Sequence, residues 1–120
     1  MAEDKINKQY DLEDRTLEFC KRIKNYLKEI PKTLINIEII KQLFRSAGSV
    51  GANYIEANES LGKKDFIMRI KICRKEAKES RFWLILIDTD NEKQENERQV
   101  LIQEASELMN IFGSIFRKSV

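Results

Sequence analysis

Histidine is absent from this 120-residue chain, and cysteine is limited to Cys20 and Cys73. Without histidine there is no imidazole base, no cysteine–histidine nucleophile pair and no ordinary zinc site. The Glu-x-x-His motif of di-metal carboxylate bundles is missing for the same reason. We therefore predict a protein that is not an enzyme, binds no metal or cofactor, and shows no sign of a small-molecule substrate.

Long apolar runs are missing as well. The longest uninterrupted run covers residues 82–87, far fewer than the about 20 residues that cross a bilayer. We also find no basic leader followed by an apolar segment. These absences predict a cytoplasmic protein without a membrane segment. Cys20 and Cys73 are then buried thiols in a reducing compartment, and the alternative is a single disulfide between them.

Glycine and proline are scarce, at four and one residues, whereas 42% of the chain is hydrophobic and 35% is charged. This composition is typical of long amphipathic helices, so we predict an all-α fold. Apolar residues recur at three- and four-residue spacing in four segments, with Asp11 as the first N-cap and Pro31 as a stop. We predict one domain over residues 1–120, an antiparallel up-down-up-down four-helix bundle with helices at about 12–30, 34–58, 63–87 and 92–118.

The third predicted helix has two apolar sides. Its inward stripe contains Ile70, Ala77 and Leu84, and a second group lies about 100° away around the helix. We call this second group the apolar flank, and it consists of Met68, Ile72, Trp83 and Leu86. One core cannot bury both sides, so we expect a homo-oligomer. The alternative is that the first or fourth helix of the same chain covers the flank.

The second predicted helix has no charge between Arg45 and Glu56 and is rich in small residues there. Gly48 and Gly51 each cost about 1 kcal/mol relative to alanine inside a helix. We interpret that cost as close packing of another helix backbone, which supports association between subunits, and the alternative is a bend in the helix.

A polar ladder follows one line of the same helix, formed by Arg45, Ser49, Ala52 and Glu56, with Asn53 slightly to one side. If a neighbouring subunit covers this line, the buried charges need partners, and we expect Arg45 and Glu56 to pair across the interface. Glu76 and Glu79 of the third helix could instead meet Arg45 or Asn53. We assign these polar residues and Trp83 to an oligomer interface or a structural polar network. A carboxylate enzyme using Glu56, Glu76 and Glu79 is the remaining catalytic alternative.

The third helix also carries cations at three- and four-residue spacing, which we call the basic stripe. It consists of Lys71, Arg74, Lys75, Lys78 and Arg81. Such a stripe is suited to nucleic-acid phosphates. We expect no exposed aromatic platform beside it, so binding would depend on backbone charge or shape. The alternative is a solvated face that pairs with the acidic segment from Asp88 to Glu107.

Three segments carry a resemblance to a known family. The sequence RSAGSVGANYIE at residues 45–56, KDFI at 64–67 and KEAKESRFWL at 75–84 resemble the bacterial 23S rRNA intervening-sequence proteins, also called the S23 ribosomal protein family. The resemblance spans nearly the whole chain and rests mainly on the spacing Arg45-x3-Ser49-x3-Asn53-x2-Glu56.

The resemblance implies a left-handed bundle that assembles as a ring, commonly a pentamer, without catalytic activity. Members encoded within 23S rRNA genes, and the related accessory variability protein of diversity-generating retroelements, suggest association with nucleic acid. We therefore predict a homo-oligomer that binds RNA or a nucleoprotein through the basic stripe. The alternative function is a protein–protein adaptor or scaffold without a nucleic-acid role.

Overall fold

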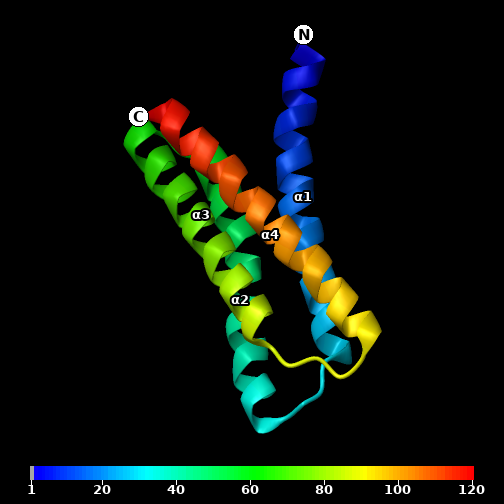
Figure 1. The fold of residues 1–120 in the computed structure, drawn as a ribbon. Helices are drawn as coiled ribbons and strands as arrows, with labels where there is room; N and C mark the ends of the chain where they lie inside the picture. Colours follow the sequence, from blue (N-terminus) through cyan, green and yellow to red (C-terminus); the bar gives the residue numbers. More distant parts are fainter. Residues whose placement is uncertain (1) are drawn as a thin grey trace.

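Four helices in antiparallel order make up the fold (Figure 1). The computed structural model describes the backbone of residues 2–120 and the side chains from Leu12 onward. The helices are α1 (Ala2–Glu29), α2 (Leu34–Asn58), α3 (Lys63–Leu86) and α4 (Glu92–Ser119). The predicted all-α four-helix bundle is confirmed.

The helix ends agree with the sequence prediction to within one residue except at the start of α1. The bounds of α2 are those predicted, α3 ends one residue earlier and α4 ends one residue later. In contrast, α1 begins at Ala2 and runs through Asp11, which therefore does not cap it. Residues 2–10 contain no proline or glycine that would stop a helix, and the preference of aspartate for an N-cap is too weak to begin one by itself.

Side-chain caps fix two of the helix starts. The Thr33 hydroxyl accepts a hydrogen bond from the Asn36 amide at the start of α2, and the Asn91 side chain accepts one from the Gln94 amide at the start of α4. Both caps satisfy backbone donors that lack a partner inside the helix. Pro31 lies in the turn between α1 and α2, where a continuing helix would need the N–H that proline lacks.

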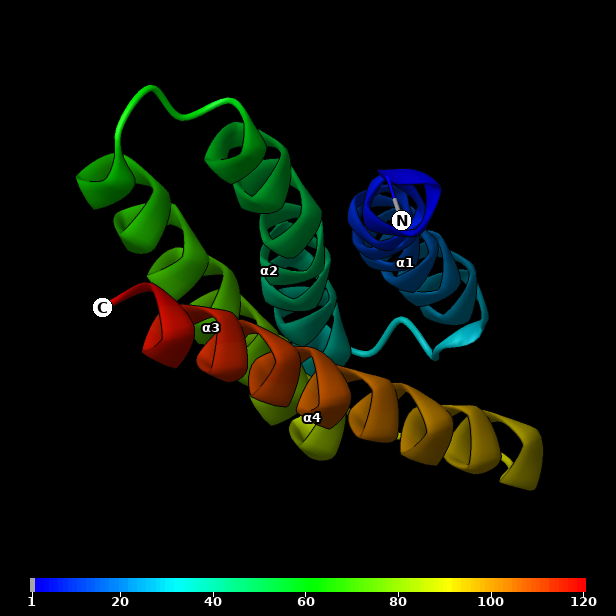
Figure 2. The ribbon, with the colours of Figure 1, turned by 90° about the horizontal axis from the view of Figure 1, so that it is seen from above.

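Each helix packs on its neighbours in the chain, and α1 also packs on α4. Viewed from above, α2 lies between α1 and α3 (Figure 2). The N-terminal part of α1 diverges from the other helices, and the C-terminus lies beside the α2–α3 turn (Figure 1). The basic third helix is therefore held between α2 on one side and α4 on the other.

The core runs the length of the bundle and contains apolar side chains from all four helices. Within it, the rings of Tyr54 and Phe112 lie 5.6 Å apart in a tilted arrangement. The largest fully buried apolar residues include Phe19, Ile23, Leu43, Ile70, Leu84, Leu101 and Leu108. Their three- and four-residue spacing is that of the predicted inward stripes.

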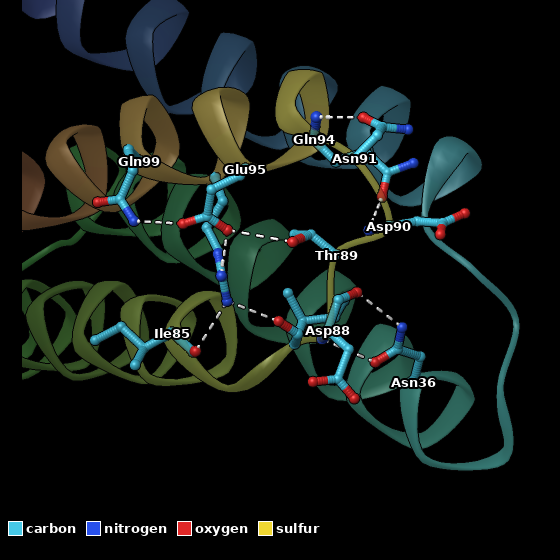
Figure 3. A network of polar contacts seen from close by, with 11 residues as sticks. Asn36, Ile85, Asp88, Thr89, Asp90, Asn91, Gln94, Glu95 and Gln99 are labelled. Carbon is cyan, nitrogen blue, oxygen red and sulfur yellow. Dashed lines mark hydrogen bonds and ion pairs between the residues drawn. The ribbon is translucent and has the colours of Figure 1, made fainter.

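A polar network joins the two loops at one end of the bundle (Figure 3). The fully buried Asn36 side chain donates to the carbonyls of Pro31 and Asp88 and accepts from the Asp88 amide. The side-chain amide of Gln94 donates to the Glu29 carbonyl, and Arg98 donates to the carbonyls of Ile85 and Ile87. These bonds satisfy carbonyls at the C-terminal ends of α1 and α3.

Both cysteines are free thiols, Cys20 half-buried on α1 and Cys73 buried on α3. The Cys73 thiol donates to the Val50 carbonyl at 3.4 Å, and burial raises its pKa to about 12. In the described part of the chain, no helix has a segment long and apolar enough to cross a membrane.

Candidate functional site: a polar seam and a basic face on the third helix

Arg45 joins α2 to α3 within one chain. Its guanidinium donates to Glu76 at 3.1 Å and also to Glu79. Glu76 is buried, whereas half of the Arg45 side chain is exposed. Burial alone would lower the pKa of Arg45, but the two carboxylates outweigh it and the pKa is raised. The expected meeting of Glu76 and Glu79 with Arg45 is therefore found, between two helices of the same subunit.

Three further polar contacts lie along the same line, two between α2 and α3 and one within α2. The hydroxyls of Ser46 and Ser80 are fully buried and lie 2.9 Å apart. The Asn53 amide donates to the Ser49 hydroxyl at 2.9 Å, and its carbonyl accepts from Arg69 at 3.0 Å. Asn53 thus meets a cation of α3, where the sequence suggested a carboxylate. We call these α2–α3 contacts the polar seam.

Glu56 lies apart from the polar seam. Its side chain is exposed, and its backbone carbonyl accepts a hydrogen bond from Ser60. Arg45 is already bound to two carboxylates within its own chain, so Glu56 is not needed to neutralise it. The pairing of Arg45 with Glu56 between subunits stays a prediction.

The glycines of α2 face α1. A methyl group at Gly51 would lie 3.2 Å from the Thr16 hydroxyl and 3.7 Å from the Thr16 backbone, whereas one at Gly48 would lie 3.8 Å from the Cys20 sulfur. Both glycines keep negative backbone φ angles. The close approach of α1 therefore explains Gly51. This helix belongs to the same chain, so the glycines do not give the support for subunit association that the sequence suggested.

The apolar flank of α3 is only partly covered within the chain. Trp83 and Ile72 are half-buried, and Trp83 packs against the core. Met68 and Leu86 keep about half of their surface exposed, at 49% and 51%. Full cover of the flank by the first or fourth helix, the alternative weighed from the sequence, is therefore not found.

The basic stripe lies on the outer side of α3, next to α4. Lys71, Arg74, Lys75 and Lys78 are exposed and Arg81 is half-buried. A shallow hollow of about 440 Å³ is lined by the first four of these cations together with Met68 and Ile72. The Lys71 ammonium lies 5.9 Å from the centre of the Phe116 ring of α4.

The acids of α4 pair with other cations. Arg15 of α1 binds Glu104 at 2.7 Å and Glu107 at 2.9 Å, and Arg22 of α1 binds Glu97 at 2.7 Å. The hydrogen bond to Glu104 is the main cause that raises the pKa of Arg15. Across residues 12–120, no ion pair includes a cation of the basic stripe. Within this chain the acidic segment of α4 therefore does not neutralise the stripe.

The fold adds Arg117 to the positive surface. A methyl group placed on Gly113 would lie 3.2 Å from the Arg117 guanidinium and 3.5 Å from Arg74 Nε. Two guanidinium groups thus converge above a residue that has no side chain. Sequence analysis missed Arg117 because the contact depends on how the last turn of α4 crosses α3, and no short motif reports that crossing.

Phe82 corrects the expectation that no exposed aromatic ring accompanies the stripe. It follows Lys71, Lys75 and Lys78 at helical spacing and is 57% exposed. Its ring contacts Trp83 edge to face, with centroids 5.0 Å apart and planes at 79°. The sequence prediction was wrong here because Phe82 belongs to a continuous apolar run, which suggested burial.

Comparison with known proteins identifies the family. The model of the 23S rRNA-intervening sequence protein family matches residues 8–114. The chain belongs to this family. No curated protein matches it. It is also similar to a crystal structure at 1.70 Å resolution, that of a protein of unknown function from the S23 ribosomal protein family of Bacteroides thetaiotaomicron VPI-5482. The TM-score is 0.75 at 31% identity, covering 92% of this chain and 98% of the other.

The family match includes both surfaces described above. The polar seam, the apolar flank and the basic stripe all lie within residues 8–114, whereas Arg117 lies outside the matched range. In this member of the 23S rRNA-intervening sequence protein family, Arg45 and Asn53 hold α2 against α3, and Ser49 binds Asn53 within α2. They therefore position the helix that carries the basic stripe.

Proposed function

We propose that this chain is a non-catalytic bundle that binds the phosphate backbone of RNA through the basic stripe. The observation that carries the proposal is the lack of carboxylate partners for these five cations across residues 12–120. Unneutralised cations on one helix attract phosphates by charge and release counterions on binding. The family description, which refers to sequences that interrupt 23S rRNA, supports RNA as the ligand.

The convergence of Arg74 and Arg117 above Gly113 supports the same proposal. Two like charges held side by side repel each other, and an anion between them removes that repulsion. Guanidinium groups also match the geometry of phosphate oxygens with two parallel hydrogen bonds. One phosphate of the RNA is therefore expected at this point.

We propose further that the protein assembles with copies of itself through the apolar flank. Met68 and Leu86 expose about half of their surface, and covering that half contributes about 1 kcal/mol each, roughly half the value for a fully exposed side chain. A ring of five subunits is the form implied by the family resemblance. Light scattering should give a multiple of 14.2 kDa, and Leu86→Glu should lower the measured mass.

The free thiols of Cys20 and Cys73 fit a reducing compartment, so we place the protein in the cytoplasm. The competing function is a protein adaptor, in which the flank binds another protein and the stripe stays solvated. The measurement of RNA binding described next separates the two functions.

The test is the affinity for a structured RNA, measured by fluorescence anisotropy over a range of salt concentrations. If all five cations contact phosphates, the logarithm of the affinity should fall with the logarithm of the salt concentration with a slope of about −4. The variant Lys75→Gln/Lys78→Gln should bind more weakly and reduce the slope by about 2.

The matched control is Lys21→Gln/Lys24→Gln, which removes two exposed lysines at the same spacing from α1. It should leave the slope nearly unchanged. Equal losses in the two double variants would show attraction by net charge alone, and no binding at any salt concentration would favour the adaptor.

A further inference from the structure

Phe82 places an exposed aromatic ring at the end of a row of cations. Lys71, Lys75, Lys78 and Phe82 occur at intervals of four, three and four residues, so they share one face of α3. The helical rise of about 1.5 Å per residue puts the ring about 17 Å from Lys71 along the axis. The same face therefore offers positive charge first and then a flat apolar surface.

The ring is held in place by the chain. Trp83 packs against the core and contacts Phe82 edge to face. This geometry is favourable between aromatic rings and limits rotation of the exposed one. Ile85, which lies outside the apolar flank, is 54% exposed and adds apolar surface next to it.

We infer that this face binds single-stranded nucleic acid, with phosphates at Lys71, Lys75 and Lys78 and one unpaired base stacked on Phe82. The inference rests on the proposed function and names the form of nucleic acid that it concerns. Two kinds of group on the face match the two parts of a single strand, because phosphates need cations and exposed bases need an aromatic or apolar surface.

Duplex nucleic acid matches only part of this face. Its phosphates can contact the lysines, but its bases are paired and stacked inside the helix and cannot lie on Phe82. A loop, a bulge or a free end satisfies both parts. The ligand is therefore expected to be an unpaired segment.

The experiment compares two single-stranded probes of equal length and charge. One is a short oligodeoxythymidine, and the other is the same deoxyribose–phosphate chain without bases. Binding of the full-length protein is measured by fluorescence anisotropy at one low salt concentration. Phe82→Leu keeps an apolar side chain but removes the ring, and Phe44→Leu is the matched control because Phe44 is 46% exposed on α2.

We expect Phe82→Leu to weaken binding of oligodeoxythymidine about tenfold and to leave binding of the abasic chain unchanged. Phe82→Trp should restore or strengthen binding of the base-containing probe, because it keeps an aromatic face. Lys75→Gln/Lys78→Gln should weaken binding of both probes. Phe44→Leu should change neither.

Equal binding of oligodeoxythymidine by Phe82→Leu and the unchanged protein would overturn the inference and leave the proposed RNA binding intact. The same holds if Phe82→Leu lowers the mass in light scattering without altering binding, because the ring then lies between subunits. If the unchanged protein binds neither probe and also fails to bind structured RNA, both the proposed function and the inference are overturned.

Discussion

Asn36 connects two loops through one buried amide group. Its side chain binds the backbone of Pro31 once and that of Asp88 twice. Asn36→Ala would leave three backbone groups without these partners, each buried group costing about 1 to 3 kcal/mol when unsatisfied. We expect the free energy of unfolding to fall by about 3 kcal/mol, measured by urea denaturation.

The matched control is Asn110→Ala, because Asn110 is exposed on α4. Its effect should stay within about 0.5 kcal/mol. A loss of stability that is the same for both variants would mean that water replaces the Asn36 bonds at no cost.

The ion pairs of α4 predict a loss of stability in acid. A hydrogen bond from Gln103 first, and then the bond to Arg15, hold the pKa of Glu107 below its ordinary value of 4.5. A carboxylate whose pKa is lower in the folded state stabilises the fold above its unfolded value, and this contribution disappears as the pH falls through the folded value. The free energy of unfolding should therefore decline below about pH 4.5.

Arg15→Gln provides the comparison, measured by urea denaturation at each pH. It removes one cause of the lowered pKa of Glu107, so the acid-dependent part of the loss should become smaller. Glu95 should keep its contribution, since Gln99 and then Arg98 lower its pKa. If the pH dependence of the unfolding free energy is the same in Arg15→Gln, Arg15 is not a cause of the acid-dependent loss.

Single residues also show where sequence reasoning reaches its limit. The pattern selected Arg45, Glu76 and Glu79 as partners because charges in an apolar stretch need counter-ions. It favoured an interface between subunits for Arg45, whereas both carboxylates belong to the same chain. Spacing along a helix reports which residues share a face, but not which helix covers that face.

Among the helices, α2 offers a matched pair of glycine substitutions. Alanine at Gly48 would make an ordinary contact with Cys20, whereas at Gly51 it would press on Thr16 at 3.2 Å. Glycine costs about 1 kcal/mol relative to alanine inside a helix. We therefore expect Gly48→Ala to raise the free energy of unfolding by about 0.5 to 1 kcal/mol.

Gly51→Ala should raise the free energy of unfolding by less than Gly48→Ala, or lower it, because Thr16 must move to make room. The urea midpoints of both variants decide the comparison. They report stability directly only if the unfolding free energy depends on urea concentration with the same slope in both variants. A larger gain for Gly51→Ala would show that α1 yields without cost, contrary to the close approach described above.

Helix limits were predictable where the signals are local. The stop at Pro31 and the N-caps Thr33 and Asn91 lie within a few residues of the helix starts that they determine, so α2 and α4 begin at the predicted residues. The start of α1 was not predictable, because no residue before Asp11 stops a helix. The exposure of Phe82 was also missed, since Phe82 belongs to a continuous apolar run.

On the scale of the whole molecule, α1 is attached differently from the other helices. Three ion pairs from Arg15 and Arg22 link it to α4, and Figure 1 shows its N-terminal part diverging from the bundle. The seam between α2 and α3 combines buried serines, an arginine bound to two carboxylates and apolar packing. Partly exposed ion pairs of this kind contribute modestly, on the order of 1 kcal/mol each.

Phe19 and Ile23 anchor the later part of α1 in the core. Its packing on α2 and α4 is nevertheless less extensive than the packing of α3 on those two helices, so we expect α1 to open before α2 and α3 unfold. Native-state hydrogen exchange should give lower opening free energies for residues 12–29 than for the amides of α3. Arg15→Gln/Arg22→Gln should increase exchange in α1 and leave α3 nearly unchanged, because it removes only the ion pairs to α4. Uniformly faster exchange in all four helices would instead show a single cooperative unit. In that case α1 and the helix with the basic stripe would unfold together, and RNA bound to α3 would protect α1 as strongly as α3.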